Sequence, residues 1–134
     1  MIGLVESFGL PYALVTESDL LDPRCLRRFH HIILPMADFL PVIVGDKTAT
    51  RLARDSRVVP LPLQDRPVTR SAFREMLRQH QIPFRLNFDS DKILAGRIGN
   101  LIYNWGDQPL QVTLPEKKTD AALEPYGFLF LEKR

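Results

Sequence analysis

Nucleophilic and metal-binding side chains are scarce in this sequence, which contains one cysteine, Cys25, and three histidines, His30, His31 and His80. A catalytic cysteine of the amidotransferase type sits on a tight strand-to-helix turn, where backbone N–H groups can form an oxyanion hole. Cys25 instead lies near the start of an expected helix with no glycine beside it, so we interpret it as structural. Adjacent residues such as His30 and His31 point in different directions. We therefore expect no metal and no other cofactor.

Two pairs of carboxylates have the spacing of potential acid and base groups: Glu17 with Asp19, and Asp89 with Asp91. A glycosidase needs two such groups about 5–10 Å apart across a sugar, with the pKa of the acid raised by its surroundings. Both pairs lie in expected loops at strand ends, where aspartate ordinarily ends or caps an element. We therefore predict no catalytic residue and interpret the protein as a non-enzyme.

Three aromatic residues near the C-terminal end are candidates for ligand binding: Tyr103, Tyr126 and the sole tryptophan, Trp105. Alternation along a strand places Tyr103 and Trp105 on the same face. We interpret that face as the core of a β-sandwich, with Trp105 the more exposed of the two because it is near a turn. In the alternative, the three rings form the sugar-stacking platform of a carbohydrate-binding module.

Basic residues are concentrated between residues 47 and 85, which hold nine lysines and arginines against three acidic residues. The candidates for a nucleic-acid footprint are Arg51, Arg54, Arg70, Arg74 and Arg78. The last three recur every four residues, and we interpret them as the solvated outer stripe of a helix. No aromatic residues interleave with them, as stacking on bases requires. A small basic nucleic-acid binder is thus the second alternative, and we do not favour nucleic acid as a partner.

The chain has 134 residues, of which 45% are hydrophobic and 25% charged, and its net charge is +2. That is enough for one domain or two very small halves, and it excludes a wholly disordered chain. No apolar run approaches the roughly 20 residues of a membrane span, and the first residues lack the basic segment of a secretory signal. A single cysteine excludes an intrachain disulfide. We expect a cytoplasmic protein without a membrane segment.

Hydrophobic periodicity predicts both helices and strands before residue 88, and strands alone after it. The expected helices are the end of a helix over 1–8, then 22–30, 47–55 and 70–80. The expected strands of this first part are 12–15, 31–34, 42–44, 58–61 and 84–88. Alternating strands follow at 93–97, 100–105, 110–114 and 127–131, with turns at 106–107 and 116–120. The predicted fold is α+β: a flavodoxin-like fragment over 1–88 and an antiparallel β portion over 89–134, sharing one core.

Two stretches resemble a known family. The segment Gly-Leu-Pro-Tyr-Ala-Leu-Val-Thr-Glu-Ser-Asp-Leu at 9–20, followed by His-Ile-Ile-Leu-Pro at 31–35, is similar to the amidotransferase-like accessory domain of β-galactosidase-type glycoside hydrolases. The stretch 92–114, with Leu-Ile-Tyr-Asn-Trp at 101–105, resembles the small terminal β-domain of such enzymes. Their catalytic barrel needs about 250 residues and has no counterpart in this chain. The resemblance implies a non-catalytic accessory or assembly domain.

The resemblance also bears on partners. The accessory domain of the family begins with a strand and a full helix, whereas only a helix end precedes residue 9. An α/β unit without them leaves a sheet edge and an apolar face open, which isolated domains avoid. We therefore expect a homo-oligomer or a partner protein, with carbohydrate as the alternative ligand.

Overall fold

The computed structural model describes residues 2–35, 37–61 and 68–132, and the chain is α+β, as predicted. Its elements group into two units whose residues do not follow one another in sequence. The α/β unit spans residues 13–67, and the β unit combines the residues up to Tyr12 with those from Val68 on. This grouping by packing differs from the division at residue 88 that the pattern of elements suggests.

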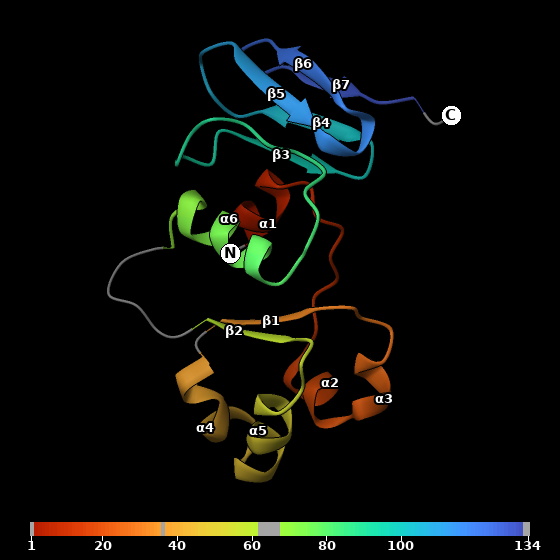
Figure 1. Ribbon diagram of the computed structural model, residues 1–134, viewed down its shortest axis with the longest axis vertical. Coiled ribbons are helices and arrows are strands. Elements are labelled where there is room, and N and C mark those ends of the chain that lie inside the picture. The colour runs from red at the N-terminus through yellow and green to blue at the C-terminus, as the bar shows by residue number, and fades with distance from the viewer. Residues whose placement is uncertain (1, 36, 62–67, 133–134) are drawn as a thin grey trace. The chain divides into compact units, whose positions relative to one another are not determined.

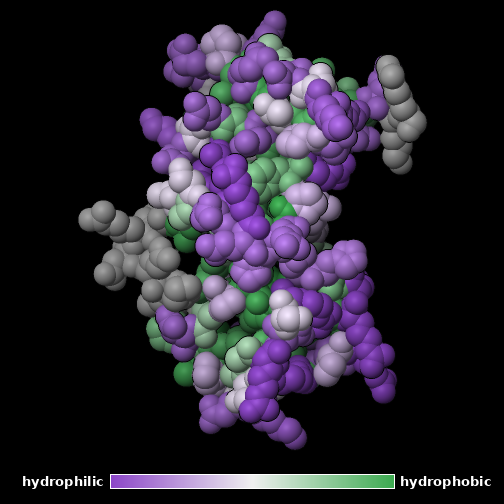
Figure 2. Space-filling view, viewed as in Figure 1, coloured by the Kyte–Doolittle hydropathy of each residue, from purple (hydrophilic) through white to green (hydrophobic). Residues whose placement is uncertain are grey.

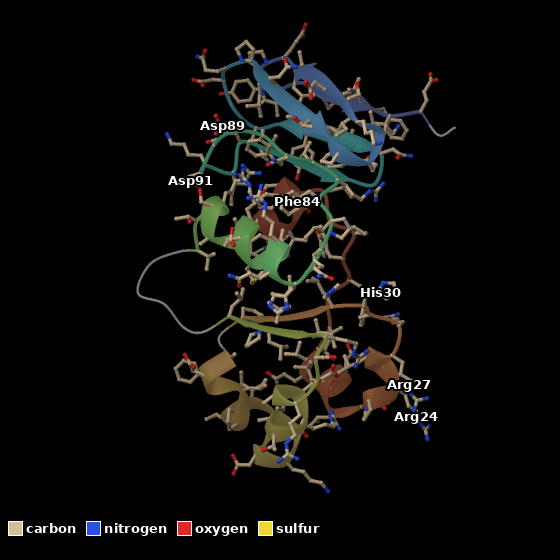
Figure 3. All side chains as sticks on the ribbon, viewed as in Figure 1. Arg24, Arg27, His30, Phe84, Asp89 and Asp91 are labelled. Atoms are coloured by element: carbon tan, nitrogen blue, oxygen red, sulfur yellow. The ribbon has the colours of Figure 1, made fainter. Side chains whose placement is uncertain are left out.

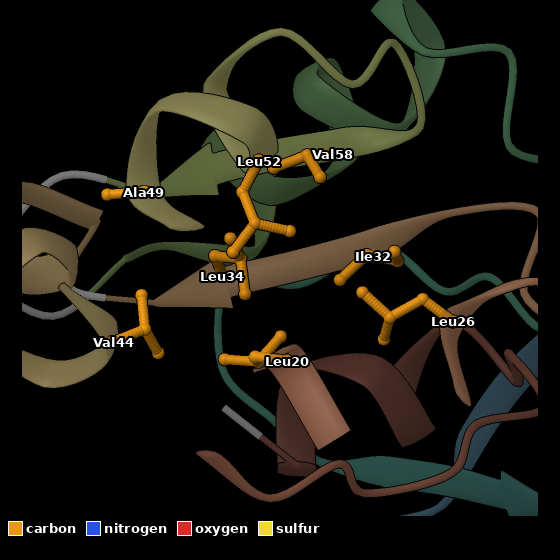
Figure 4. Close-up of a cluster of buried hydrophobic side chains, with 8 residues drawn as sticks. All are labelled: Leu20, Leu26, Ile32, Leu34, Val44, Ala49, Leu52 and Val58. Carbon is orange, nitrogen blue, oxygen red and sulfur yellow. The ribbon is translucent and has the colours of Figure 1, made fainter. Parts of the chain in front are cut away.

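The α/β unit contains a parallel pair of strands covered on one face by helices (Figure 1). Its elements are α2 (Glu17–Leu21), α3 (Pro23–Leu26), β1 (Ile32–Pro35), the 3-10 helix η1 (Ala37–Phe39), α4 (Leu40–Val44), α5 (Asp46–Ala53) and β2 (Val58–Leu61). Ile32 of β1 lies opposite Val58 of β2. Figure 4 shows the core of this unit, which consists of Leu20, Leu26, Ile32, Leu34, Val44, Ala49, Leu52 and Val58.

Local chemistry explains where the helices of this unit begin. Asp22 accepts a hydrogen bond from the Arg24 backbone N–H (2.9 Å), and proline occupies the first position of α3. The helix is shorter than predicted and ends at Leu26. Thr16 caps α2, and Asp19 returns a hydrogen bond to the Thr16 N–H in a reciprocal capping box. That box was not anticipated from the sequence.

Two strand predictions for this unit are wrong. Residues 12–15 have no regular structure, and residues 42–44 belong to α4. Pro41 in the first turn of α4 suits a helix start, because its missing N–H would be unpaired there in any case. Gly45 ends the helix with a φ of 87°, a backbone conformation that glycine adopts without steric cost. The helix signals of Pro41 and Gly45 outweigh the strand preference of the β-branched run Val42-Ile43-Val44.

The β unit contains two antiparallel sheets and two helices (Figure 1). Its elements are α1 (Ile2–Ser7), α6 (Arg70–Gln79), β3 (Ala95–Ile98), β4 (Leu101–Asn104), β5 (Leu110–Leu114), the 3-10 helix η2 (Pro115–Lys117), β6 (Thr119–Leu123) and β7 (Phe128–Phe130). The sheets are β3-β4-β7 and β5-β6. The two sheets share a core of Ala95, Ile102, Val112, Leu114 and Leu123, to which the segment before β3 adds Leu86 and Phe88.

The predicted helix at 70–80 and the predicted strands near 95, 102, 112 and 129 are confirmed. The predicted strand at 84–88 is wrong, because this segment makes a single bridge, from Asn87 to Thr113. Strand β6 begins with Thr119 and Asp120, which were expected to end the turn over 116–120. It pairs with β5, from Leu110 opposite Leu123 to Leu114 opposite Thr119, which gives the backbone groups along one edge of each strand their partners.

Arg70 is fully buried, so the prediction that it belongs to a solvated stripe of α6 is wrong. Its Nη1 donates to the carbonyls of Phe88 (2.9 Å) and Ser90 (2.6 Å), and its Nε donates to Oγ of Ser7 (3.1 Å). The guanidinium also lies over the rings of Phe8 and Phe88, at 4.4 and 3.6 Å from their centroids. Burial lowers the pKa of Arg70 to about 10, with a smaller effect from Arg74. One cation thus joins α1, α6 and the segment before β3.

We predict that Arg70→Leu lowers the free energy of unfolding by about 3 kcal/mol, because it leaves buried carbonyls without a donor. Urea denaturation followed by circular dichroism measures the change. Arg78→Leu removes a charge of the same kind from an exposed position of the same helix, and should cost less than about 1 kcal/mol. Equal losses for the two variants would contradict a special role for Arg70.

Candidate functional site

The residues with nucleophilic or metal-binding chemistry do not form a site in the described ranges. No group of three or more His, Cys, Asp or Glu side chains there is arranged to hold a metal ion. Burial and then Asp22 raise the pKa of Cys25, whose Sγ lies 3.7 Å from the Asp22 carboxylate. A raised pKa disfavours the reactive thiolate. The side chains of His30 and His31 are exposed.

One member of each carboxylate pair accepts hydrogen bonds at the start of a helix. Asp19 belongs to the capping box of α2, and hydrogen bonds from the backbone and side chain of Thr16 lower its pKa. Asp91 accepts hydrogen bonds from the side chain and backbone N–H of Ser71, which lower its pKa too. Figure 3 shows Asp89 and Asp91 on the segment that precedes β3. A general acid needs a raised pKa, so neither Asp19 nor Asp91 is suited to that role.

The five candidate arginines are divided between the two units. Arg51 and Arg54 belong to the α/β unit, where they line a shallow groove with Asp46, Lys47 and Thr50. The others belong to the β unit, where Arg70 is buried. Arg74 is half-buried and donates to the side chain of Asn87 (3.1 Å) and the carbonyl of Phe88 (3.2 Å). Of the three arginines in this unit, Arg78 is the exposed one.

Arg24 and Arg27, which the sequence reasoning did not single out, extend outward from α3 (Figure 3). On the face of the molecule shown in Figure 2, hydrophilic residues lie among the hydrophobic ones over most of the surface.

The outward side of the three-stranded sheet carries a group of apolar and aromatic side chains, which we call the aromatic face. Its members are Ile98, Leu101, Tyr103, Trp105, Phe128 and Phe130. The register places Leu101 between Ile98 and Phe130, and Phe128 opposite Tyr103. Four members are strongly exposed: Ile98 by 54%, Trp105 by 64%, Phe128 by 78% and Phe130 by 69%.

The opposite side of β4 faces the core, so the prediction that Tyr103 and Trp105 lie on the core face is wrong. Ile102 is fully buried and Asn104 nearly so. The Asn104 amide donates to the carbonyls of Gln108 (2.8 Å) and Glu124 (3.1 Å) and accepts from the Gly106 N–H (2.8 Å). These bonds offset the cost of burying a polar side chain. The expected exposure of Trp105 near its turn is confirmed.

Tyr103 is held in place at the side of the face nearest α1. Its hydroxyl donates to the carboxylate of Glu6, and Tyr12 donates to the other oxygen of the same carboxylate (2.8 Å). The ring lies over Gly96, where a Cβ atom would collide with it. Burial and then Glu6 raise the pKa of Tyr103, while the Glu6 hydrogen bond is the main cause of the raised pKa of Tyr12.

Trp105 and Tyr126 lie at one end of this sheet. The Trp105 ring meets Tyr103 edge to face, with centroids 4.7 Å apart and planes at 63°. Tyr126 is 71% exposed, and its φ of 54° is rare for a residue with a side chain. Its N–H donates to the carbonyl of Gly106 (3.0 Å) in the turn after Trp105. Tyr126 lies in the turn that precedes β7.

The aromatic face has the chemistry of a binding surface. None of its six side chains is charged at neutral pH, and Tyr103 is the one with an ionisable group. It supplies no acid, base or nucleophile suited to catalysis. It does supply a contiguous apolar area, which is typical of protein interaction sites when it exceeds a few hundred Å².

Comparisons with protein-family models, with curated proteins and with solved structures find no match for this chain. None of the helices in the described part of the chain has the length and apolar character that crossing a bilayer takes.

We predict that Glu6→Gln lowers the pKa of Tyr12 toward its ordinary value, because the hydrogen bond to the carboxylate is the main cause of its rise. The pKa of Tyr103 should fall less and stay raised, since burial is its main cause. Carbon-13 NMR of ring-labelled tyrosines between about pH 8 and pH 12 measures the pKa of Tyr12 and shows whether Tyr103 stays protonated to higher pH than Tyr12. Glu75→Gln, an exposed control, should change neither. An unchanged pKa of Tyr12 in Glu6→Gln would show that the contact does not exist in solution.

Proposed function

We propose that this chain is a non-catalytic accessory or assembly domain, related to those that accompany the catalytic barrel of β-galactosidase-type glycoside hydrolases. The observation that carries the proposal is the uncharged aromatic face. The resemblance of 9–35 and 92–114 to that family supports it further, as does the combination of a small parallel α/β unit with an antiparallel β unit. The surface expected to need a partner was the sheet of the α/β portion, whereas the face that supports assembly belongs to the β unit.

The composition of the aromatic face favours protein over the other ligands considered. Aromatic residues are enriched at protein interfaces, where charged residues are depleted from the centre. A sugar site combines rings with polar groups that bind hydroxyls, whereas Phe128, Phe130 and Ile98 offer none. A nucleic acid requires cations beside the rings, and the face contains none. Assembly with another protein surface fits these side chains best.

Photo-crosslinking in the cells of origin tests assembly. With a benzophenone amino acid in place of Phe128, irradiation should yield a covalent protein adduct, because that position would lie inside an interface. The same group in place of Ala122, which is exposed on β6 in the other sheet, is the matched control and should yield little adduct. Mass spectrometry of the adduct identifies the partner. Absence of an adduct at Phe128, or equal yields at the two positions, would refute assembly through this face.

A second candidate function, carbohydrate binding, is favoured by Trp105 and Tyr126. Both rings are well exposed, and the positive φ of Tyr126 indicates that the backbone holds this residue in an unfavourable conformation. Tyr103 contributes less than a stacking platform needs, since it is half-buried and edge to face with Trp105. A sugar site here would therefore consist of Trp105 and Tyr126.

Fluorescence distinguishes this candidate, because Trp105 is the sole tryptophan. If the site binds sugar, galactose- or glucose-based oligosaccharides quench Trp105 emission with a saturating dependence, and Tyr126→Ala raises the midpoint at least tenfold. Tyr12→Ala, which removes a tyrosine outside the aromatic face, should leave the midpoint unchanged. Emission that does not change up to about 10 mM saccharide would exclude a carbohydrate site of useful affinity at these residues.

A further inference from the structure

We propose that the aromatic face is covered by a second copy of this chain, with the two faces packed against each other about a two-fold axis. The inference rests on the proposed assembly function and names its partner. In a two-fold interface the same patch is used by both copies, so the patch must be complementary to itself. The chemistry, area and rigidity of the aromatic face all meet this requirement.

The first argument is charge complementarity. A partner with charged groups at the contact would have to lose their hydration, and the face offers no opposite charge in return. Another copy of the same face presents the same uncharged side chains, led by Phe128 and Phe130, the most exposed members. Like charges, which commonly oppose the pairing of identical surfaces, are absent from its six side chains. The aromatic face of a second copy is therefore a suitable partner for this one.

The second argument is area. At about 150–250 Å² for a large aromatic side chain, the exposed fractions of Ile98, Trp105, Phe128 and Phe130 amount to roughly 500 Å² of mostly apolar surface. Two copies together would bury about 1,000 Å², which is the lower bound for a specific interface. We therefore expect a dimer that dissociates at micromolar concentration rather than a permanent one.

The third argument is rigidity and shape. The face lies on three paired strands, whose order places Ile98 on one edge strand and Phe130 on the other (Figure 1). Tyr103, between them along β4, is fixed by Glu6 and by its close approach to Gly96. A surface that is already ordered loses less conformational entropy when it binds. Two such sheets can pack face to face about 10 Å apart, as in a β-sandwich.

Sedimentation equilibrium of the purified full chain tests this inference. We expect the wild type to move from 15.4 kDa toward twice that mass as its concentration rises through the micromolar range. Trp105 emission should shift to shorter wavelength over the same concentrations, because dimerisation removes Trp105 from water. Phe128→Lys should raise the dissociation constant at least 100-fold. Ala122→Lys, with the same added charge on the other sheet, should leave it unchanged.

Two copies could dimerise by packing their aromatic faces together or by pairing their β7 edge strands alone. The variant Ile98→Lys distinguishes these two modes. It should also raise the dissociation constant at least tenfold, because Ile98 lies on the strand farthest from β7. Circular dichroism checks that each variant is folded, and exposed positions such as these should not disturb folding.

Three outcomes would overturn the inference: a wild-type monomer at about 100 µM, a dimer that survives Phe128→Lys, or one that survives Ile98→Lys. The adduct formed at Phe128 in cells then identifies what has failed. An adduct with a different protein retains the assembly function and rejects the second copy, whereas the absence of any adduct rejects both.

Discussion

The β unit depends on a cation that has been removed from water and that donates, among the residues that the structure describes, to carbonyl and hydroxyl oxygens rather than to a carboxylate. The hydration of Arg70 is replaced by three carbonyl groups, one hydroxyl and two aromatic faces, which come from segments before residue 9 and after residue 87. Each of these partners is also a buried group that needs a donor or a neighbour. The guanidinium therefore determines where α1 lies on α6. Because α1 carries Glu6, Arg70 also sets the position of the carboxylate that holds Tyr103.

The burial of Arg70 follows from the geometry of α6. The four-residue spacing of Arg70, Arg74 and Arg78 suggests that they share one face, but they do not. At about 100° per residue, Arg74 and Arg78 are displaced from Arg70 by roughly 40° and 80° around the axis. Leu77, seven residues away, is displaced by only about 20° in the other direction. Arg70 therefore belongs with the buried residues Phe73 and Leu77, and Arg78 belongs with solvent. Comparing the position of Arg70 on a helical wheel with that of Leu77, rather than with the other arginines, would have predicted its burial.

The strands after residue 93 could be placed from alternation, but alternation does not say which of two faces is buried. Along β4 the choice was between a set containing Ile102 and Asn104 and a set containing Tyr103 and Trp105. The large apolar area of the aromatic rings, and the polar side chain of Asn104, favour the second set as the core. The structure buries the first, because the Asn104 amide finds partners in the two turns beside it. Alternation of hydrophobic residues takes no account of such hydrogen bonds to turn backbone. It likewise misses β6 (Thr119–Leu123), whose aspartate and alanines have little intrinsic preference for strands and which becomes a strand by pairing with β5.

The discontinuity of the β unit has a consequence for the order of events during synthesis. Phe8, at the end of α1, packs against Phe73 of α6, which is made about 65 residues later. At about 5–20 residues per second, the apolar side of α1 waits several seconds for its partner, while the whole α/β unit emerges. The core around Leu34 and Leu52 is complete before that of the β unit. On a ribosome the inserted unit thus folds first, and the first residues of the chain are among the last to find their place.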